Sequence, residues 1–201
     1  MARDLNKARM RDTKFLIAVA VLAGIFCRPL FPADGAVHGV MMFLGVALAL
    51  LCTCGRVYST AFIGGAKNQQ LVTWGPYSLC RNPLYFFSLC GAAGIGLMSG
   101  SLTIFVILLG GFLYIYDGLI KREEGFLGEK FGAAFTDFKS STPRLLPDIR
   151  KWKCPDELTF QPKYLNYAVR DAVWWLAPWP VFMLSGWLQA EGIIPQLLPL
   201  I

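Results

Sequence analysis

The chain has 201 residues, of which 55% are hydrophobic, and it carries a formal net charge of +6. Its mean hydropathy of +0.49 excludes an ordinary soluble domain and indicates a membrane protein with several apolar helices. The basic excess does not indicate nucleic-acid binding, because 18 of the 19 lysines and arginines fall in residues 1–14, 55–84 and 121–170, between the apolar runs. Such a bias places these segments, and the N-terminus, on the cytoplasmic side of a membrane.

Five apolar stretches predict an all-helical bundle of about five transmembrane helices in a single domain. The expected spans are residues 15–27, 36–54, 83–98, 102–120 and 172–188. An N-terminal arm and two spans occupy 1–65, the motif region 66–147, and a cytoplasmic segment with an additional C-terminal span 148–201. Pro178 and Pro180 should kink the last span, and a re-entrant hairpin running to the end of the chain is the alternative description.

The cysteines and the histidine do not predict a metal site or a disulfide framework. The six cysteines include no Cys-x-x-Cys pair, and four of them lie in expected spans, where a free thiol behaves as a small hydrophobe. His38 is at the outer end of the second span, across the membrane from the other polar motifs. No cleavable signal peptide is expected, since no small-residue cleavage site follows the first apolar run.

A polar, turn-rich stretch separates the second and third spans. Residues 69–85 read Gln-Gln-Leu-Val-Thr-Trp-Gly-Pro-Tyr-Ser-Leu-Cys-Arg-Asn-Pro-Leu-Tyr. Gly75-Pro76 predicts a turn, because glycine tolerates a positive φ and proline fixes its own φ at about −65°. Asn82-Pro83 predicts a helix start, with asparagine as the cap and proline at the first helical position. Arg81 precedes this helix at the edge of apolar sequence, where a guanidinium is costly without a partner.

Charges of the opposite sign follow the fourth span in the tripeptide Arg122-Glu123-Glu124. Residues 121–139 predict an amphipathic helix whose apolar stripe covers the cytoplasmic mouth of the bundle. The stripe consists of Leu127, Phe131, Phe135 and Phe138. The segment Thr-Pro-Arg-Leu-Leu-Pro at 142–147 should end this helix in an extended path, and residues 148–170 are expected to be polar chain.

Together these motifs resemble a known family. The pattern comprises Gly75-x-Tyr77, Arg81-Asn82-Pro83-x-Tyr85, Glu123-Glu124, Phe131-Gly132 and Pro143-Arg144-x-x-Pro147. It is similar to the membrane methyltransferases typified by isoprenylcysteine carboxyl methyltransferase, with phosphatidylethanolamine N-methyltransferases as more distant relatives. The resemblance covers roughly residues 66–147 and neither end of the chain.

The resemblance implies that S-adenosylmethionine binds at the cytoplasmic end of the bundle, between the two motif regions. Carried over by position, the cofactor-binding residues are Gln69, Gln70, Leu71, Val72, Tyr77, Asn82, Pro83, Leu84, Tyr85 and Glu123. One departure concerns the acceptor, because the family has a substrate-binding arginine four residues before the glutamate and this chain has Leu119 there. A prenylcysteine carboxylate is therefore not predicted as the specific substrate.

The charges suit such a cofactor, although each also has a structural interpretation. S-adenosylmethionine carries an ammonium, a sulfonium and a carboxylate, so it needs partners of both signs, and a tyrosine ring can face the sulfonium. Arg81 alone could anchor lipid phosphate, Glu123 and Glu124 could form a solvated helix face, and Tyr77 and Tyr85 could be interfacial aromatics. The spacing of these motifs, with one helical hairpin between them, favours the functional interpretation.

The expected reaction is methyl transfer to a lipid or lipidated acceptor that enters from the bilayer. A carboxylate or phosphate oxygen needs no general base at pH 7, whereas an ammonium does, and only acids such as Glu124 or Asp117 could serve. We therefore favour O-methylation, with Arg81, Arg122, Arg144 and Glu124 as the catalytic candidates. Phospholipid amine N-methylation, a nicotinamide-dependent reductase of the sterol Δ14 type and a non-catalytic membrane scaffold are the alternatives. The oligomeric state is left open.

Overall fold

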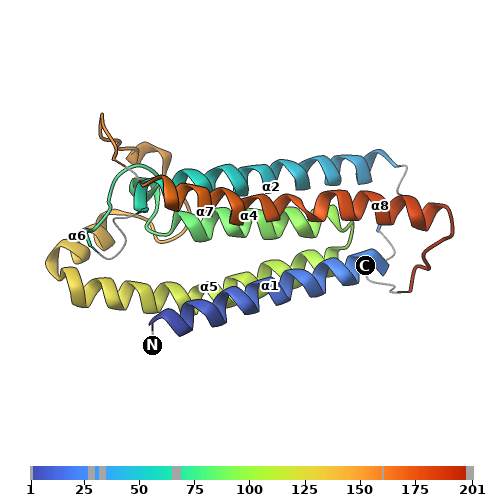
Figure 1. Ribbon diagram of the computed structural model, residues 1–201, viewed down its shortest axis with the longest axis horizontal. Coiled ribbons are helices and arrows are strands. Elements are labelled where there is room, and N and C mark those ends of the chain that lie inside the picture. Colours follow the sequence, from blue (N-terminus) through green and yellow to red (C-terminus); the bar gives the residue numbers. More distant parts are fainter. Residues whose placement is uncertain (1, 27–29, 32–34, 65–68, 160, 198–201) are drawn as a thin grey trace. The chain divides into compact units, whose positions relative to one another are not determined.

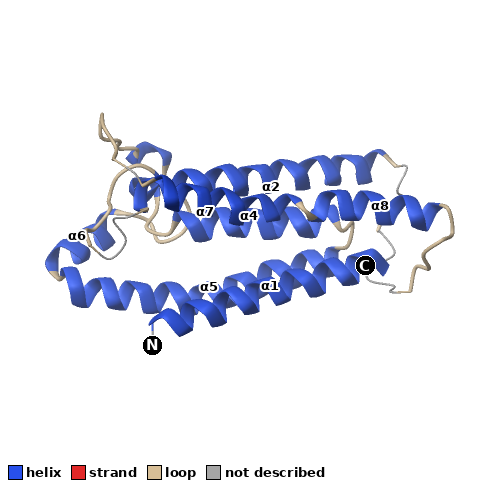
Figure 2. Cartoon of the chain, viewed as in Figure 1, coloured by secondary structure: helices blue, strands red, loops and turns tan. Residues whose placement is uncertain are grey.

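The computed structural model describes residues 2–26, 30–31, 35–64, 69–159 and 161–197, and this part of the chain is helical without a strand (Figures 1 and 2). The α-helices are α1 Ala2–Phe26, α2 Ala36–Ile63, α3 Pro76–Leu79, α4 Pro83–Met98, α5 Leu102–Phe131, α6 Ala133–Ser141, α7 Pro162–Val173 and α8 Pro178–Ala190. Two 3₁₀ turns, η1 Ile149–Lys151 and η2 Trp174–Leu176, complete the secondary structure. The prediction of an all-helical protein is confirmed.

Two of these helices are long and apolar enough to cross a membrane. They are α2, with 28 residues, and α5, with 30 residues. Shorter apolar helices cover Thr13–Phe26 and Pro83–Met98. The residues expected to form a fifth span are divided, because η2 interrupts the helix before Pro178 and α8 has 13 residues, which rise about 20 Å.

Several helix boundaries differ from the sequence prediction. Helix α1 is continuous from Ala2, where an interfacial arm and a separate span were expected. Helix α2 continues past residue 54 to Ile63. Gly55 lies within it as a packing residue, since a Cβ atom there would overlap the ring of Phe87. Residues 162–170, expected as polar chain, belong to α7, which also includes the first residues of the expected fifth span and ends at Val173.

The predicted amphipathic helix over residues 121–139 is also divided. Its first half is the end of α5, and its second half is α6. The two meet at Gly132, whose φ of +54° is a left-handed conformation that favours glycine. Periodicity did not reveal this break, because the hydrophobic spacing continues on both sides of it.

The chain divides into two compact units. The first unit comprises Met1–Leu51, Leu89–Ile115 and Trp174–Ile201, and the second comprises Cys52–Ser88 and Tyr116–Val173. In the first unit, glycines let helices approach closely, as is common between membrane helices. A Cβ atom on Gly96 would lie 2.6 Å from Cα of Phe105, and one on Gly94 would lie 2.6 Å from the carbonyl oxygen of Gly45 on α2. Gly100, with φ of +68°, makes the hairpin turn.

Candidate functional site

The sequence motifs come together in the second unit, where residues 75–82 run beside the segment after α6. The backbone N–H of Arg81 donates to Pro143 O at 2.8 Å, and that of Gly75 donates to Lys153 O at 2.7 Å. Gly75 has a φ of +61°, which confirms the predicted turn. It also lies against the ring of Phe62, so that a side chain has neither room nor a favourable backbone conformation there.

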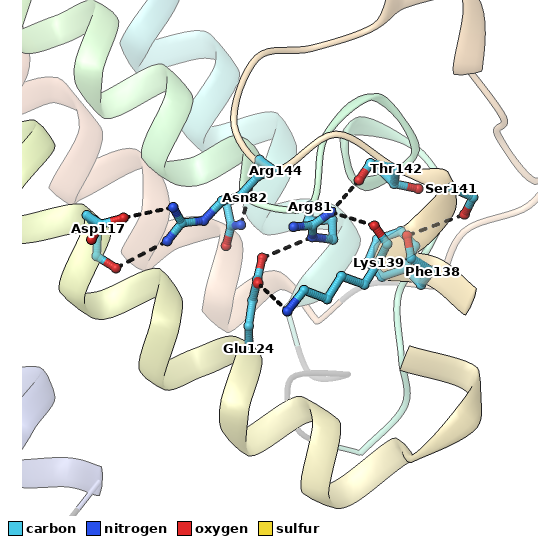
Figure 3. A network of polar contacts seen from close by, with 9 residues as sticks. All are labelled: Arg81, Asn82, Asp117, Glu124, Phe138, Lys139, Ser141, Thr142 and Arg144. Atoms are coloured by element: carbon cyan, nitrogen blue, oxygen red, sulfur yellow. Dashed lines mark hydrogen bonds and ion pairs between the residues drawn. The ribbon is translucent and has the colours of Figure 1, made fainter. Parts of the chain in front are cut away.

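Arg81 is the centre of a polar network (Figure 3). Its Nε donates to Glu124 Oε1 at 2.9 Å, and the side chains of these two residues are only 8% and 11% exposed. One terminal nitrogen donates to the carbonyl oxygens of Lys139, at 2.8 Å, and Thr142. Lys139 Nζ lies 3.5 Å from the other oxygen of Glu124. A buried ion pair needs additional hydrogen bonds of this kind to offset the desolvation of both charges.

The structure therefore brings the predicted cation and acid together, but as direct partners. The sequence interpretation gave Arg81 an anion from a cofactor or substrate. In the structure that anion is Glu124 of the same chain. The pair ties the polar stretch to α5, so the arrangement suits positioning of neighbouring groups more directly than contact with a ligand.

Arg144 forms a second, more exposed part of the network. Its guanidinium donates to Asp117 Oδ1 at 2.7 Å, and the two side chains are 37% and 44% exposed. Its carbonyl oxygen accepts a hydrogen bond of 3.0 Å from Asn82 Nδ2. The Asn82 carbonyl accepts from the N–H groups of Tyr85 and Phe86, as expected of the residue that precedes a helix.

Tyr77 is buried, and its hydroxyl has no hydrogen-bond partner in the described structure. Burial raises the pKa of the Tyr77 phenol, and the negative charge of Glu123 raises it further, while Arg56 acts in the opposite direction. The indole N–H of Trp74 is likewise buried and unpartnered. Such groups are costly in a folded protein unless a water or a ligand supplies the missing hydrogen bond, so both are candidates for ligand contact.

The other predicted site residues are spread between this region and the surface. Val72 packs with Phe62 and Tyr77 in one apolar cluster. The rings of Tyr85 and Tyr116 lie 4.8 Å apart between centroids. Pro83 is buried, Leu71, Leu84 and Glu123 are half-buried, and Gln69, Gln70 and Arg122 are exposed.

Sequence reasoning missed another ion pair in this unit. Arg56, near the end of α2, donates to Asp171 Oδ2 on α7 at 2.7 Å and to Ser88 Oγ on α4 at 2.5 Å. The sequence feature that could have indicated this pair is Arg56 itself, a single arginine close to the end of a long apolar helix. An ionisable residue in such a position usually has a partner. Its partner is 115 residues away in the sequence, so no local pattern points to it.

The cysteines of the described chain are free thiols, and no group of three or more His, Cys, Asp or Glu side chains that could hold a metal ion occurs there. Burial raises the pKa of the Cys80 thiol to about 11, so this thiol is neutral at physiological pH. A neutral buried thiol is a poor nucleophile, and Cys80 packs as a small apolar side chain.

Comparison with known proteins identifies a matching family and two relatives. Residues 48–134 match the phospholipid methyltransferase family. The cobalt-zinc-cadmium resistance protein CzcN of Cupriavidus metallidurans is 35% identical over 144 residues, which cover 71% of this chain and 66%, just under two thirds, of that relative. The nickel-cobalt-cadmium resistance protein NccN of Alcaligenes xylosoxydans xylosoxydans is 30% identical over 172 residues, covering 86% of this chain and 80% of the relative. No solved structure gives a significant match.

The family match begins in α2 and ends just after α5, so it includes Arg56, Tyr77, Arg81 and Glu124. These are residues that the structure gathers in the second unit. On the sequence match and the shared motifs, the chain belongs to the phospholipid methyltransferase family of membrane methyltransferases, which includes the isoprenylcysteine methyltransferase-like proteins.

Proposed function

We propose that this protein is an integral membrane methyltransferase that uses S-adenosylmethionine and acts on a lipid or lipidated acceptor at the cytoplasmic face. The observation that carries the proposal is the gathering of the family's motif residues in the second unit, within the matched residues 48–134. Tyr77, Arg81 and Glu124 come from different segments, yet they belong to one compact unit.

The residues present fit the cofactor. Its adenosine and methionine parts offer several hydrogen-bond acceptors, and the buried Tyr77 hydroxyl and Trp74 N–H are donors that lack an acceptor. Arg81 and Lys139 engage Glu124. We assign the cofactor's ammonium to Glu123, because it matches the family's cofactor-binding glutamate by position and its charge acts on Tyr77.

The chain's own contribution is to orient and shield the reacting groups. When bound, S-adenosylmethionine supplies a methyl group whose bond to sulfur breaks, with both electrons returning to sulfur, as the acceptor oxygen forms its bond to carbon. Arg81 and Glu124 fix the polar stretch against α5, so that Tyr77 and Tyr85 keep their positions. The paired rings of Tyr85 and Tyr116 offer an electron-rich face for the sulfonium.

We propose an anionic oxygen as the nucleophile. A carboxylate or phosphate is already ionised at pH 7, and the transfer then releases no proton that a base must accept. The guanidinium of Arg144 is 37% exposed, and Arg122 is exposed, so both can approach an acidic headgroup. N-methylation of a phospholipid amine is the alternative. It requires a general base to remove a proton from the ammonium, and the carboxylate of Asp117 or Glu124 could serve.

The membrane arrangement follows the same proposal. Helices α2 and α5 span the bilayer, the shorter apolar helices within α1 and α4 accompany them, and α8 completes a bundle of five. The basic segments 1–14, 55–84 and 121–170 face the cytoplasm. The second unit contains two of these segments, residues 55–84 and 121–170, which supports a cytoplasmic location for the methyl-transfer chemistry.

The proposal is tested by incubating the purified protein with methyl-labelled S-adenosylmethionine and a total lipid extract, followed by mass spectrometry of labelled products. We expect a labelled lipid with the wild type and none with Glu123→Ala, while both proteins insert and unfold alike. Calorimetry measures binding of the donor separately. Absence of donor binding by a folded wild type contradicts the proposal and favours a scaffold.

The names of the two relatives suggest a cellular setting. Both are called resistance proteins for divalent transition metals. Methylating an anionic headgroup removes a negative charge that attracts such cations to the membrane surface. We propose that this protein contributes to metal tolerance in that way. Cells that express the wild type should then tolerate more cadmium than cells that express Glu123→Ala, and equal growth of the two contradicts this role.

A further inference from the structure

The Arg56–Asp171 pair is built differently from the Arg81–Glu124 pair. Both side chains of the Arg81 pair are nearly buried, whereas Arg56 is 23% exposed and Asp171 is 46% exposed. Arg56 is held in place by Ser88, whose hydroxyl is fully buried and donates to Leu84 O. Asp171, by contrast, lies at the exposed end of this contact. The cation is thus preorganised, and its carboxylate partner is the part that solvent or a ligand can replace.

Arg56 also belongs to the same electrostatic environment as the proposed cofactor site. Its positive charge acts on Tyr77 in opposition to the charge of Glu123. Ser59, one turn further along α2, is fully buried, and its hydroxyl has no partner in the described structure. Phe62, a further turn along, packs against Tyr77. One face of α2 therefore carries a cation, an unpartnered hydroxyl and a contact with the candidate site.

The partner carboxylate comes from outside the family core. Residues 48–134 match the family, and Asp171 lies beyond them on α7. Helix α7 has a second attachment beside this ion pair, because Thr53 Oγ1 donates to Ala172 O at 3.1 Å. The end of α7 can therefore stay against α2 while the Asp171 side chain rotates away from Arg56.

We propose that Arg56 is the cation that binds the anionic headgroup of the methyl acceptor, and that Asp171 occupies this position until the acceptor displaces it. This inference rests on the proposed function and names the charge of its substrate. A guanidinium held by a buried hydroxyl is suited to a carboxylate or phosphate, to which its outward terminal nitrogen can donate a charge-assisted hydrogen bond. An ion pair with a half-exposed carboxylate is weak in water, so a headgroup that brings more negative charge can compete with it.

The test measures binding of decyl phosphate, with decanol as the uncharged control, to the full chain in phosphatidylcholine nanodiscs by calorimetry. We expect Asp171→Asn to bind decyl phosphate several-fold more tightly than the wild type, because the competing carboxylate is gone. Arg56→Gln should bind it at least tenfold more weakly, and neither change should alter decanol binding. Unchanged or weaker decyl phosphate binding by Asp171→Asn overturns the proposal.

A charge exchange separates binding from structure. The double variant Arg56→Asp, Asp171→Arg can re-form an ion pair between α2 and α7, but it removes the cation from its place beside Ser88. We expect it to unfold near the wild-type temperature and to bind decyl phosphate as weakly as Arg56→Gln. Wild-type affinity in the exchanged protein overturns the inference, since attraction to net charge would then suffice.

Two controls complete the experiment. Arg150→Gln removes one positive charge from a side chain that is 91% exposed, and it should leave decyl phosphate binding unchanged. Donor binding is measured in the same preparations. If the wild type binds decyl phosphate through Arg56 but does not bind S-adenosylmethionine, the methyltransferase proposal fails and the anion site remains. The reverse result rejects the anion site alone.

Discussion

Helices α2 and α4 pack against each other in both compact units, but different kinds of residues make the contact in each unit. In the first unit, Gly45 and Gly94 bring the two backbones together, and a Cβ atom on Gly94 would lie 2.6 Å from Gly45 O. In the second unit, Gly55 accommodates the ring of Phe87, and Arg56 donates to Ser88 at 2.5 Å. The first contact needs only small residues, whereas the second also needs a charge and its partners. Function is therefore expected to be sensitive to side-chain chemistry in the second unit and only to shape in the first.

The largest effect is expected from Arg81→Ala. The substitution leaves the buried Glu124 with Lys139 as its remaining ion-pair partner in the described structure, and breaking a buried pair in this way costs about 3–5 kcal/mol. Thermal or denaturant unfolding in detergent should show this loss, and methyl transfer should disappear with it. Arg81→Lys keeps the charge but cannot donate to Glu124 and to the two carbonyl oxygens at once. Its stability and activity should therefore lie between those of the wild type and Arg81→Ala. Wild-type stability and activity in Arg81→Ala would contradict the positioning role.

The next largest effect tests the first unit. Gly94→Ala forces a methyl group against the backbone of α2, and such overpacking costs about 1–3 kcal/mol. Gly110→Ala is the matched control, because a Cβ atom there meets nothing within 4 Å, and alanine is favoured over glycine in a helix. We expect the folded fraction of Gly94→Ala to keep the wild-type affinity for S-adenosylmethionine. A changed affinity would mean that the first unit contributes to the site.

The same contrast explains what could be predicted from the sequence. The apolar runs predicted the helices, and the motif spacing predicted that Arg81 and Glu124 lie near each other, because the hairpin between them returns the chain to the same end. The pairing of Arg56 with Asp171 joins residues 115 apart in the sequence. It depends on where α7 packs, and no local periodicity carries that information. The direct Arg81–Glu124 contact was missed for a related reason, since a ligand and a protein carboxylate satisfy a guanidinium equally well.

An intermediate effect should separate binding from stability within the second unit. Tyr77→Phe removes a buried hydroxyl that has no partner, so the free energy of unfolding should stay the same or rise by about 1 kcal/mol. If the hydroxyl donates to the bound cofactor, the affinity for S-adenosylmethionine should fall by up to about tenfold. Calorimetry and unfolding of the same preparation provide both values. Equal affinity in the two proteins would remove Tyr77 from the site.

The smallest effect is expected at the exposed end of the network. Asp117→Asn weakens the ion pairs with Arg144 and Lys121, but both contacts involve partly exposed side chains, and such pairs contribute little to stability. The difference from the wild type should shrink further at high salt, where exposed charges are screened. The same variant discriminates between the two reactions. An ionised oxygen acceptor needs no base, so O-methylation should continue, whereas a severe loss of activity without loss of stability would identify Asp117 as the base for an amine.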